Sequence, residues 1–488
     1  MLAAIAPGYA VKRVRARRTL QRLYEAGSPS FQHERPLQGD LSADAVVDTA
    51  RGNIRAWARH LDENYDVIIG VLDDLVDNIV GTTGLQFEPM IRDRGGRLHA
   101  PTNQAARRLW ADFWKFPEVS RTMTGREVER LVARTWLRDG EILTDHVEGN
   151  VRGLMHATEV PYSIQLIEPD FLPWDLFVDT AGANRIVHGV EKNRWRQPVA
   201  YYLYREHPGD SAVSALSLDL ASLDRIPASR ITHLKLTKRL HQTRGISILH
   251  GVIFRADDLQ DIDRSERMAV RVASALTAVI TKDDNVEELG ETIDTEIGDR
   301  SWYFQPGMVA DNLRPGEDVR VIGSDRPNAN LIDFRADQIR AIASGTGTKY
   351  SSVSKRFDKA YSAQRQELVE SEPGYERVRG PFYERWAGEI WRRHLLSAVT
   401  AGVLRIPQVV DPRTVFDVGI RRGGGIPWID PLKEIEADVM AIDNQLSSRR
   451  EIIRKRGLDP EQVDAEIEAD PVKPQKPAPA ATAASGAA

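Results

Sequence analysis

The sequence predicts a multi-domain α+β protein, and three features of the chain support this fold class. Apolar residues recur at helical spacing on both sides of residues 141–236, a stretch in which short β-prone runs alternate with turn signals. A long helical segment follows, then a short segment with strand-like pieces, and then a returning helix. The length of 488 residues suggests two to four domains, and a hydrophobic fraction of 41% is sufficient for a sizeable core.

Composition excludes several classes of protein. The net charge of −5 argues against a protein that binds nucleic acid tightly over its whole surface, so any contact with DNA is expected to be local or weak. The absence of cysteine excludes disulfides and thiolate metal sites and fits a reducing cytosol. No apolar run is long enough to span a membrane, and the N-terminus carries its charges on the wrong side for a secretion signal. We therefore expect a protein of the cytoplasm, or of a particle assembled there, with no membrane partner.

The first segment, residues 1–40, is a basic arm. Its cations are Lys12, Arg13, Arg15, Arg17, Arg18 and Arg22. A solvated helix end and a contact with phosphate or an acidic partner explain this cluster equally well.

Helices are expected in the next hundred residues, with one strand between them. Asn64 is a candidate N-cap for a helix with an apolar stripe over residues 65–79, and residues 85–91 read as a strand. The following helix carries aromatic residues at core spacing, namely Trp110, Phe113 and Trp114. A further helix begins at Thr124, where Glu127 completes a capping-box signature.

Residues 141–236 are expected to form an antiparallel domain. The runs EILTDHV (141–147) and LMHATEV (154–160) flank a turn at Gly149 and Asn150, which predicts a hairpin. Further strands are expected in SIQLIEP (163–169), RIVHGVE (185–191), PVAYYLYRE (198–206) and RITHLKL (230–236). Short strands joined in this way favour mostly antiparallel pairing.

A hairpin-like stalk is predicted in the second half of the chain. Residues 246–282 form one long helical stretch with an acidic first half, and a helix returns over residues 331–343. Between them, residues 283–328 combine an acidic run with strand-like pieces and Pro-Gly turns. A polar helix is expected over residues 355–370, helices rich in Trp and Arg follow, and the Pro- and Ala-rich residues 470–488 are expected to be disordered.

No catalytic motif stands out in the sequence. SGTGTKYS (344–351) lacks the spacing of a phosphate loop, and G-x-G-x-x-G, H-E-x-x-H and G-x-S-x-G are absent. Asp145 and His146 are neighbours on a predicted strand, so their side chains point to opposite faces and form a poor catalytic pair. The acidic run that begins at Asp283 lacks the glycine and carbonyl spacing of a calcium loop, and a solvated or partner-facing surface is favoured over a cation site. We expect no catalytic residue, no metal site and no cofactor, and hence a structural or assembly protein.

Three segments of the chain carry a resemblance. The first is ARGNIRAWARHLDENYDVIIGVLDDLVDNIVGTTG (50–84), and the second is GISILHGVIFRADDLQDIDRSERMAVRVASALTAVI (245–280), which follows an arginine. The third combines KYSSVSKRFDKAYSA, within residues 345–371, with PWIDPLKE, within residues 425–457. Together, in this order and spacing over residues 42–470, they resemble the lambda-like family of tailed-phage portal proteins.

The resemblance implies a ring subunit of the virion. In such a family the subunits form a homo-oligomeric ring, typically a dodecamer, at one capsid vertex, after assembly in the host cytoplasm. Double-stranded DNA passes through the ring during packaging and ejection. The implied protein partners are the terminase large subunit, the major capsid protein and, later, head-completion or adaptor proteins.

Carried onto this sequence, the resemblance divides the chain into eight parts. They are a basic N-terminal arm (1–40), an α+β wing (41–244), a stem helix (245–282), a small α/β clip insertion (283–328), a returning stem helix (329–343), a tunnel loop (344–358), a helical wing or crown region (359–469) and a disordered tail (470–488).

Three sets of residues are candidates for function under this reading. A tunnel-loop set is expected to touch the DNA backbone: Lys349, Ser351, Ser352, Lys355 and Arg356. A stem set would repel phosphate where it lines the channel: Asp257, Asp258, Asp261 and Asp263. A clip set is expected to face the terminase and then the adaptor: Asp283, Asp284, Glu287 and Glu288. For the tunnel loop, a helix connection whose cations are merely solvated stays open as the alternative.

Two other functions also remain open. A nucleic-acid-processing enzyme of the head would carry a Walker motif or a clustered carboxylate metal site, and the sequence contains neither. Another head structural or connector protein without a DNA channel would have a shorter chain without the helix–insertion–helix stalk.

Overall fold

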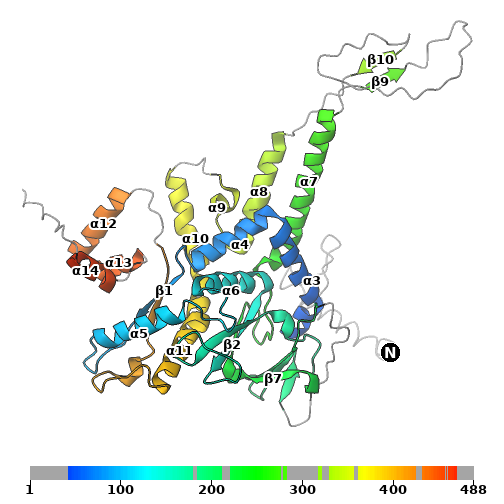
Figure 1. The fold of residues 1–488 in the computed structure, drawn as a ribbon. Helices are drawn as coiled ribbons and strands as arrows, with labels where there is room; N and C mark the ends of the chain where they lie inside the picture. The colour runs from blue at the N-terminus through cyan, green and yellow to red at the C-terminus, as the bar shows by residue number, and fades with distance from the viewer. Residues whose placement is uncertain are drawn as a thin grey trace, which may run out of the picture. The chain divides into compact units, whose positions relative to one another are not determined.

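The computed structural model describes residues 42–179, 184–210, 220–275, 279–282, 317–320, 329–356, 361–424, 431–456, 458 and 460–469. The chain divides into two units, Met1–Thr49 and Ala50–Ala488. Helices and antiparallel strands alternate along the second unit, which confirms the α+β fold class (Figure 1). The N-terminal arm, the four clip acids and the C-terminal tail lie outside the described residues.

Three helices and a two-stranded sheet surround the main apolar core. The helices are α4 (Asp66–Ile79), α5 (Ala100–Phe113) and α6 (Gly125–Asp139), and strand β1 (Leu85–Pro89) pairs with β11 (Val418–Arg422). The predicted capping box is confirmed, because Thr124 and Glu127 exchange bonds at the start of α6. The predicted cap of α4 was wrong: α3 (Ala43–Asn64) extends through Asn64, and Tyr65 occupies the N-cap without a side-chain bond.

The β-prone stretch forms two antiparallel sheets. The first has the order β3-β2-β8 and consists of β3 (Tyr162–Ile167), β2 (Glu141–Glu148) and β8 (Ile231–Lys235). The second has the order β4-β5-β6-β7 and consists of β4 (Arg185–Val187), β5 (Val190–Lys192), β6 (Pro198–Leu203) and β7 (Asp224–Pro227). Short 3-10 turns connect these strands: η2 (Pro169–Phe171), η3 (Leu220–Ser222) and η4 (Ala228–Arg230).

Two strand predictions need correction. Residues 154–160 form turns and bends, and the partner of β2 is β3, so the hairpin has a longer connection than the turn at Gly149 alone. The run at 185–191 is two strands, because the chain reverses at His188 and Gly189, which have φ of 51° and 78°. A glycine supplies the second positive φ without strain.

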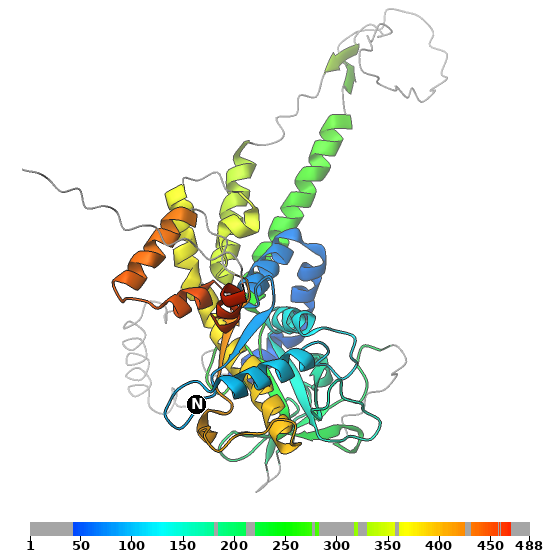
Figure 2. The same ribbon diagram turned by 60° about the vertical axis from the view of Figure 1, so that its left-hand side comes forward.

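The stalk consists of two helices that lie side by side in both ribbon views (Figures 1 and 2). The turn η5 (Ile248–Gly251) leads into α7 (Ile253–Ala275), and α8 (Ala329–Thr346) returns. Strand β9 (Val279–Lys282) pairs with β10 (Glu317–Arg320), so the end of the predicted stem helix 245–282 is a strand. The returning helix extends three residues beyond the predicted 343, and α9 (Tyr350–Ser354) occupies the middle of the predicted tunnel loop.

The C-terminal part is helical. The predicted polar helix begins later than expected, as α10 (Tyr361–Pro381), and continues through a π-helical turn, η6 (Phe382–Ala387), into α11 (Gly388–Thr400). Then follow η7 (Pro412–Thr414), α12 (Pro431–Asp443), α13 (Arg449–Lys455) and α14 (Pro460–Ala469). Trp386 and Trp391 are fully buried, and the indole of Trp386 donates to the Thr144 hydroxyl at 3.1 Å, which joins this helix to β2. None of the described helices is long and apolar enough to cross a membrane.

Candidate functional site

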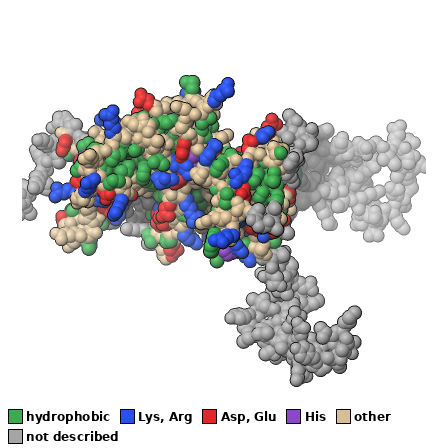
Figure 3. All heavy atoms as spheres, turned by 90° about the horizontal axis from the view of Figure 1, so that it is seen from below, with side chains coloured by type: hydrophobic (Ala, Val, Ile, Leu, Met, Phe, Trp, Pro, Cys, Tyr) green, Lys and Arg blue, Asp and Glu red, His purple; other side chains and the backbone are tan. Residues whose placement is uncertain are grey.

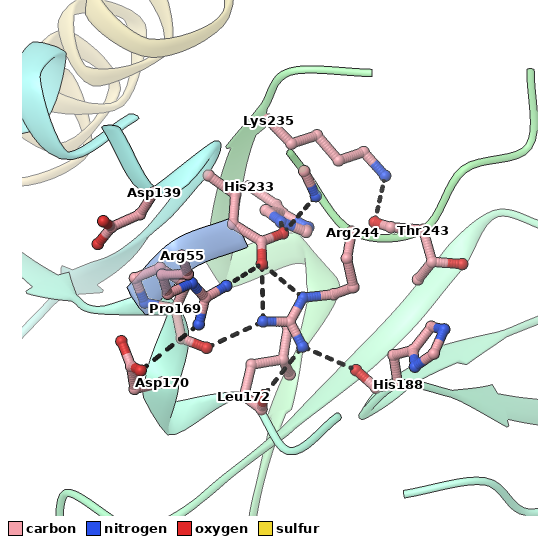
Figure 4. Close-up of polar contacts among 12 residues, drawn as sticks. Arg55, Asp139, Pro169, Asp170, Leu172, His188, His233, Lys235, Thr243 and Arg244 are labelled. Carbon is pink, nitrogen blue, oxygen red and sulfur yellow. Dashed lines mark hydrogen bonds and ion pairs between the residues drawn. The ribbon is translucent and has the colours of Figure 1, made fainter. Parts of the chain in front are cut away.

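A buried cluster of charged residues joins the start of β2 to the segment that leads into η5 and α7 (Figure 4). Glu141, the first residue of β2, is fully buried. Its carboxylate accepts from Arg244 at 2.7 Å, from Arg55 at 3.1 Å and from the backbone amide of Gly245 at 2.7 Å. His233 on β8 lies 3.0 Å from the second carboxylate oxygen.

The neighbours of Glu141 keep its carboxyl group ionised. Burial opposes this ionisation, but the charge of Arg244, the hydrogen bond of His233 and the charge of Arg55 outweigh it and hold the pKa of Glu141 well below the usual range. Burial lowers the pKa of Arg244 to about 10 and that of His233 to about 4, although Glu141 opposes both shifts. Glu141 is therefore an ionised partner of a buried guanidinium.

Arg244 fixes the segment before η5 to β2 and to the turn η2. Its guanidinium donates to the carbonyl oxygens of Pro169 and Leu172, each at 2.9 Å, and lies 4.1 Å from the ring centroid of Trp174. The next residue is locked by backbone contact, because a Cβ on Gly245 would lie 2.0 Å from the carbonyl oxygen of Gly140. The cluster is inaccessible to solvent and serves as an anchor rather than a reaction site.

The four predicted stem acids divide into two kinds. Asp263 is bonded across the stalk, because Arg335 on α8 reaches both of its carboxylate oxygens at 3.2 Å. Asp261 lies 3.7 Å from Arg264, one turn along α7. Asp257 is half-buried and Asp258 is exposed, and neither forms an ion pair with any described residue. Asp258 and Asp261 line a groove between α7 and α8 together with Ile262 and Phe334.

The predicted tunnel-loop residues also occupy two environments. Lys349 is half-buried, with its ammonium 5.3 Å from the ring centroid of Tyr375. Ser351 and Ser352 are half-buried within α9, and the amide of Ser351 donates to Glu367 at 3.0 Å. Lys355 and Arg356 are exposed.

Lys355 has an unusual backbone. It is the C-cap of α9 and has a φ of 53°, in the left-handed region that glycine normally occupies. This conformation costs a residue with a Cβ about 1–2 kcal/mol. The position therefore retains a lysine where glycine would be conformationally easier, and its side chain is exposed beside α9.

Two further features have the composition of a site but are structural. A cavity of about 530 Å³ between α5, α6 and β1 contains the buried Glu129, whose oxygens accept from the Leu85 amide at 2.7 Å and the Trp114 indole at 3.0 Å. The ligand atoms of Glu168, Asp170 and His207 lie within 4.8 Å of one another. Asp170 is already bonded to Arg59 at 2.5 Å, and this cation opposes the binding of a metal ion.

The sequence did not predict the ion pair between Glu141 and Arg244. The Arg-Gly pair before the stem was noted for its resemblance, but nothing nearby in the sequence identifies Glu141, 103 residues upstream, as its partner. Asp145 and His146 do lie on a strand as predicted, and they are separately occupied: Asp145 pairs with Arg230, and His146 contacts Tyr162 and Thr232 at 2.7 Å. They form no catalytic pair.

Comparison with known proteins identifies one family and several relatives of this chain. Residues 35–379 match the family described as "Phage portal protein, lambda family". The probable portal protein of Halomonas phage phiHAP-1 is 26% identical over 452 residues, which cover 88% of this chain and 82% of that protein. Portal protein B of Escherichia phage lambda is 24% identical over 251 residues, 46% of this chain and 47% of that protein. Among solved structures, a chain from the neck of an empty GTA particle is similar over 88% of this chain and 96% of its own length, with 13% identity and a TM-score of 0.47.

Proposed function

Because the chain belongs to the lambda family of phage portal proteins, we propose that it forms a closed ring, typically of twelve copies, that conducts double-stranded DNA at one capsid vertex. The family match over residues 35–379 carries this proposal. The stalk of α7 and α8, with paired strands beyond it, supports it as an element that would line or surround the channel. The ring has no catalytic activity of its own, so the terminase large subunit would supply the energy for packaging.

The duplex would be touched by few and weak contacts. A conduit must let DNA slide, and each additional phosphate contact adds affinity. Lys355 and Arg356 are the exposed cations of the α9 segment, and they are suited to brief contacts with the backbone of any sequence. Ser351 and Ser352 lie on the same short helix, and Lys349 lies against Tyr375 beneath it.

The unpaired stem acids would keep the wall of the channel from holding DNA. Exposed Asp258 and half-buried Asp257 are suited to this role, since no described residue neutralises them by an ion pair. Asp263 instead holds the two stem helices together through Arg335. The clip, residues 283–328 with Asp283, Asp284, Glu287 and Glu288, remains our candidate for docking the terminase and later an adaptor protein.

Electron microscopy of the purified full-length chain in negative stain tests the ring directly. Rings with a central hole are expected, whereas monomers or closed shells would contradict the proposal. An ATPase and nuclease assay of the same sample is expected to give no turnover above background. Clear intrinsic turnover would favour a processing enzyme.

The role of the α9 segment is tested by replacing Lys349, Lys355 and Arg356 with alanine. Rings should assemble normally, while the yield of packaged DNA should fall because the cations that touch phosphate are absent. The matched control replaces three exposed arginines elsewhere on the chain, Arg152, Arg185 and Arg205, and it should package normally. Unchanged yield in the first variant would remove these residues from the channel.

A further inference from the structure

Two loops that are far apart in the sequence come together at the end of the body away from α7 and α8 (Figures 1 and 2). One is the turn at residues 92–97, between β1 and α5, and the other is residues 405–413, which follow α11 and continue into η7. We call them the arginine loops. Their exposed cations are Arg94, Arg97, Arg405 and Arg413.

Backbone hydrogen bonds hold the two loops in a fixed register. Arg94 N donates to the carbonyl of Val409 at 2.9 Å, and Asp411 N donates to the carbonyl of Arg92 at 2.9 Å. The Thr414 hydroxyl accepts from the Arg92 amide, also at 2.9 Å. The loops therefore present their side chains from one rigid platform.

The turn itself is also fixed. Its reversal uses Gly96, with a φ of 81°, and the Asp93 carboxylate accepts from the amides of Gly95 at 2.8 Å and Arg97 at 3.0 Å. On the second loop, Asp411 accepts from the amide of Arg413 at 3.0 Å. These two carboxylates are thus used to build the turns.

Within the described part of the chain, the exposed arginines of the loops have no carboxylate partner. None of the four forms an ion pair with any residue that the structure describes. Several exposed arginines elsewhere are paired: Arg205 pairs with Asp224 at 2.9 Å, Arg340 with Asp337 at 2.5 Å and Arg392 with Glu389 at 2.7 Å. In a chain with a net charge of −5, the two loops carry five arginines against two aspartates, which gives them a local formal charge of +3. Seen from below, the molecule shows Lys and Arg side chains interspersed with Asp and Glu side chains and with apolar ones (Figure 3).

We propose that the arginine loops bind the phosphate backbone of duplex DNA without reading its sequence. The guanidinium fork matches phosphate oxygens and keeps its charge at any physiological pH. Rigid loops lose little conformational entropy on binding. Among the described residues of the loops, Val409 is the one large apolar side chain that is exposed, so the surface lacks the apolar anchors of a protein–protein interface.

The inference rests on the proposed function in one respect: the duplex that the ring conducts is the polyanion that the loops would meet. It adds a second contact, because the loops are separate from Lys355 and Arg356 beside the stalk. Repeated once per subunit around a ring, three or four weak contacts would sum to a measurable affinity.

The test measures binding of a labelled 30-bp duplex (about three helical turns) to the assembled full-length chain by fluorescence anisotropy, at several salt concentrations. The triple variant R94Q/R97Q/R413Q is expected to bind at least about tenfold more weakly near 100 mM salt. The slope of log K against log salt should decrease by about 0.9 for each phosphate that is no longer neutralised. The control R152Q/R185Q/R205Q removes the same charge from another part of the surface and should bind within about twofold of the parent.

Each remaining outcome has a definite meaning. Equal reductions of affinity in both triple variants, or no reduction in the loop variant, would overturn the inference. Tighter binding of poly-glutamate than of DNA would assign the loops to an acidic protein and would also overturn it. If the triple variant does not fold, the single variant R413Q should still reduce the slope by about 0.9. Negative-stain images separate the two proposals: absence of rings in the parent contradicts the proposed function, whereas intact rings with unchanged DNA affinity contradict only the arginine loops.

Discussion

The anchor around Arg244 and the stalk that follows it place their charges in opposite environments. At the anchor, Glu141 and Arg244 are fully buried, so each side chain relies on the other, and not on water, to compensate its charge. On the stalk, Asp258, Asp261 and Arg264 lie at the surface, and Asp263 with Arg335 is the partly buried exception. The buried pair thus holds the base of the stalk rigidly against β2, while the stalk keeps charged faces that are available to other molecules.

The largest effect is expected at the anchor. Glu141→Ala should lower the free energy of unfolding by about 3–5 kcal/mol, because Arg244 would be left buried without a counter-charge. Thermal unfolding followed by circular dichroism measures the change. Asp337→Ala is the control on the stalk and should cost at most about 1 kcal/mol, since its pair with Arg340 is exposed. Similar shifts in the two variants would contradict the contrast between the regions.

A decrease of stability at low pH should come from buried histidines of β2 and α11, and not from the stalk helices α7 and α8. Burial lowers the pKa of His394 to about 3 and that of His146 to about 3, below the ordinary value of 6.5. Both histidines stay neutral in the folded chain but take up a proton when unfolded below that value. Stability is therefore fully present above pH 6.5 and falls as the pH decreases toward 3, by about 2 kcal/mol per histidine at pH 5.

The variant His394→Leu isolates one of these contributions. It removes the ionisable ring that stacks on Phe113 at 4.4 Å, so the difference in stability between pH 7.5 and pH 5 should shrink by about 2 kcal/mol. Leu395→Met, at the neighbouring buried position of α11, changes no ionisable group and is the control, so it should leave the difference unchanged. An unaltered pH profile in the His394 variant would show that this ring does not contribute.

A smaller effect is expected at the end of α9. Lys355→Gly should raise the free energy of unfolding by about 0.5–1 kcal/mol, because glycine relieves the left-handed conformation at the price of a more flexible unfolded chain. Lys355→Ala keeps the Cβ and should give no gain. Greater stability of the glycine variant together with less packaged DNA would indicate that the lysine is kept for function.

The smallest effect is expected at the pair that joins the stem helices. Asp263→Ala should cost about 1 kcal/mol or less, because Arg335 is 40% exposed and solvent screens the pair. The charge exchange D263R/R335D should recover part of this stability, as a double-mutant cycle measures. A destabilisation as large as that at Glu141 would make the stalk as dependent on paired charge as the anchor around Arg244.

Local patterns in the sequence were sufficient for many elements. The apolar stripe of α4 and the capping box at Thr124 depend on residues within four positions of one another, so the sequence alone specifies them. The strand at residues 154–160 was predicted wrongly because a β-prone run is insufficient without a partner: β2 instead pairs with β3 and β8. The start of the stem helix was likewise placed too early, since η5 precedes it.

Sequence by itself thus determined the α+β class, the helical stalk and, through resemblance, the family, because each depends on local spacing or on short ordered motifs. Only the tertiary structure decided which charges meet. Arg244 finds Glu141 from 103 positions away, Arg335 reaches Asp263 from 72 positions away, and the turn at Arg94 lies against Val409. A residue's exposure and partners depend on how distant segments pack, and local periodicity carries no information about that packing.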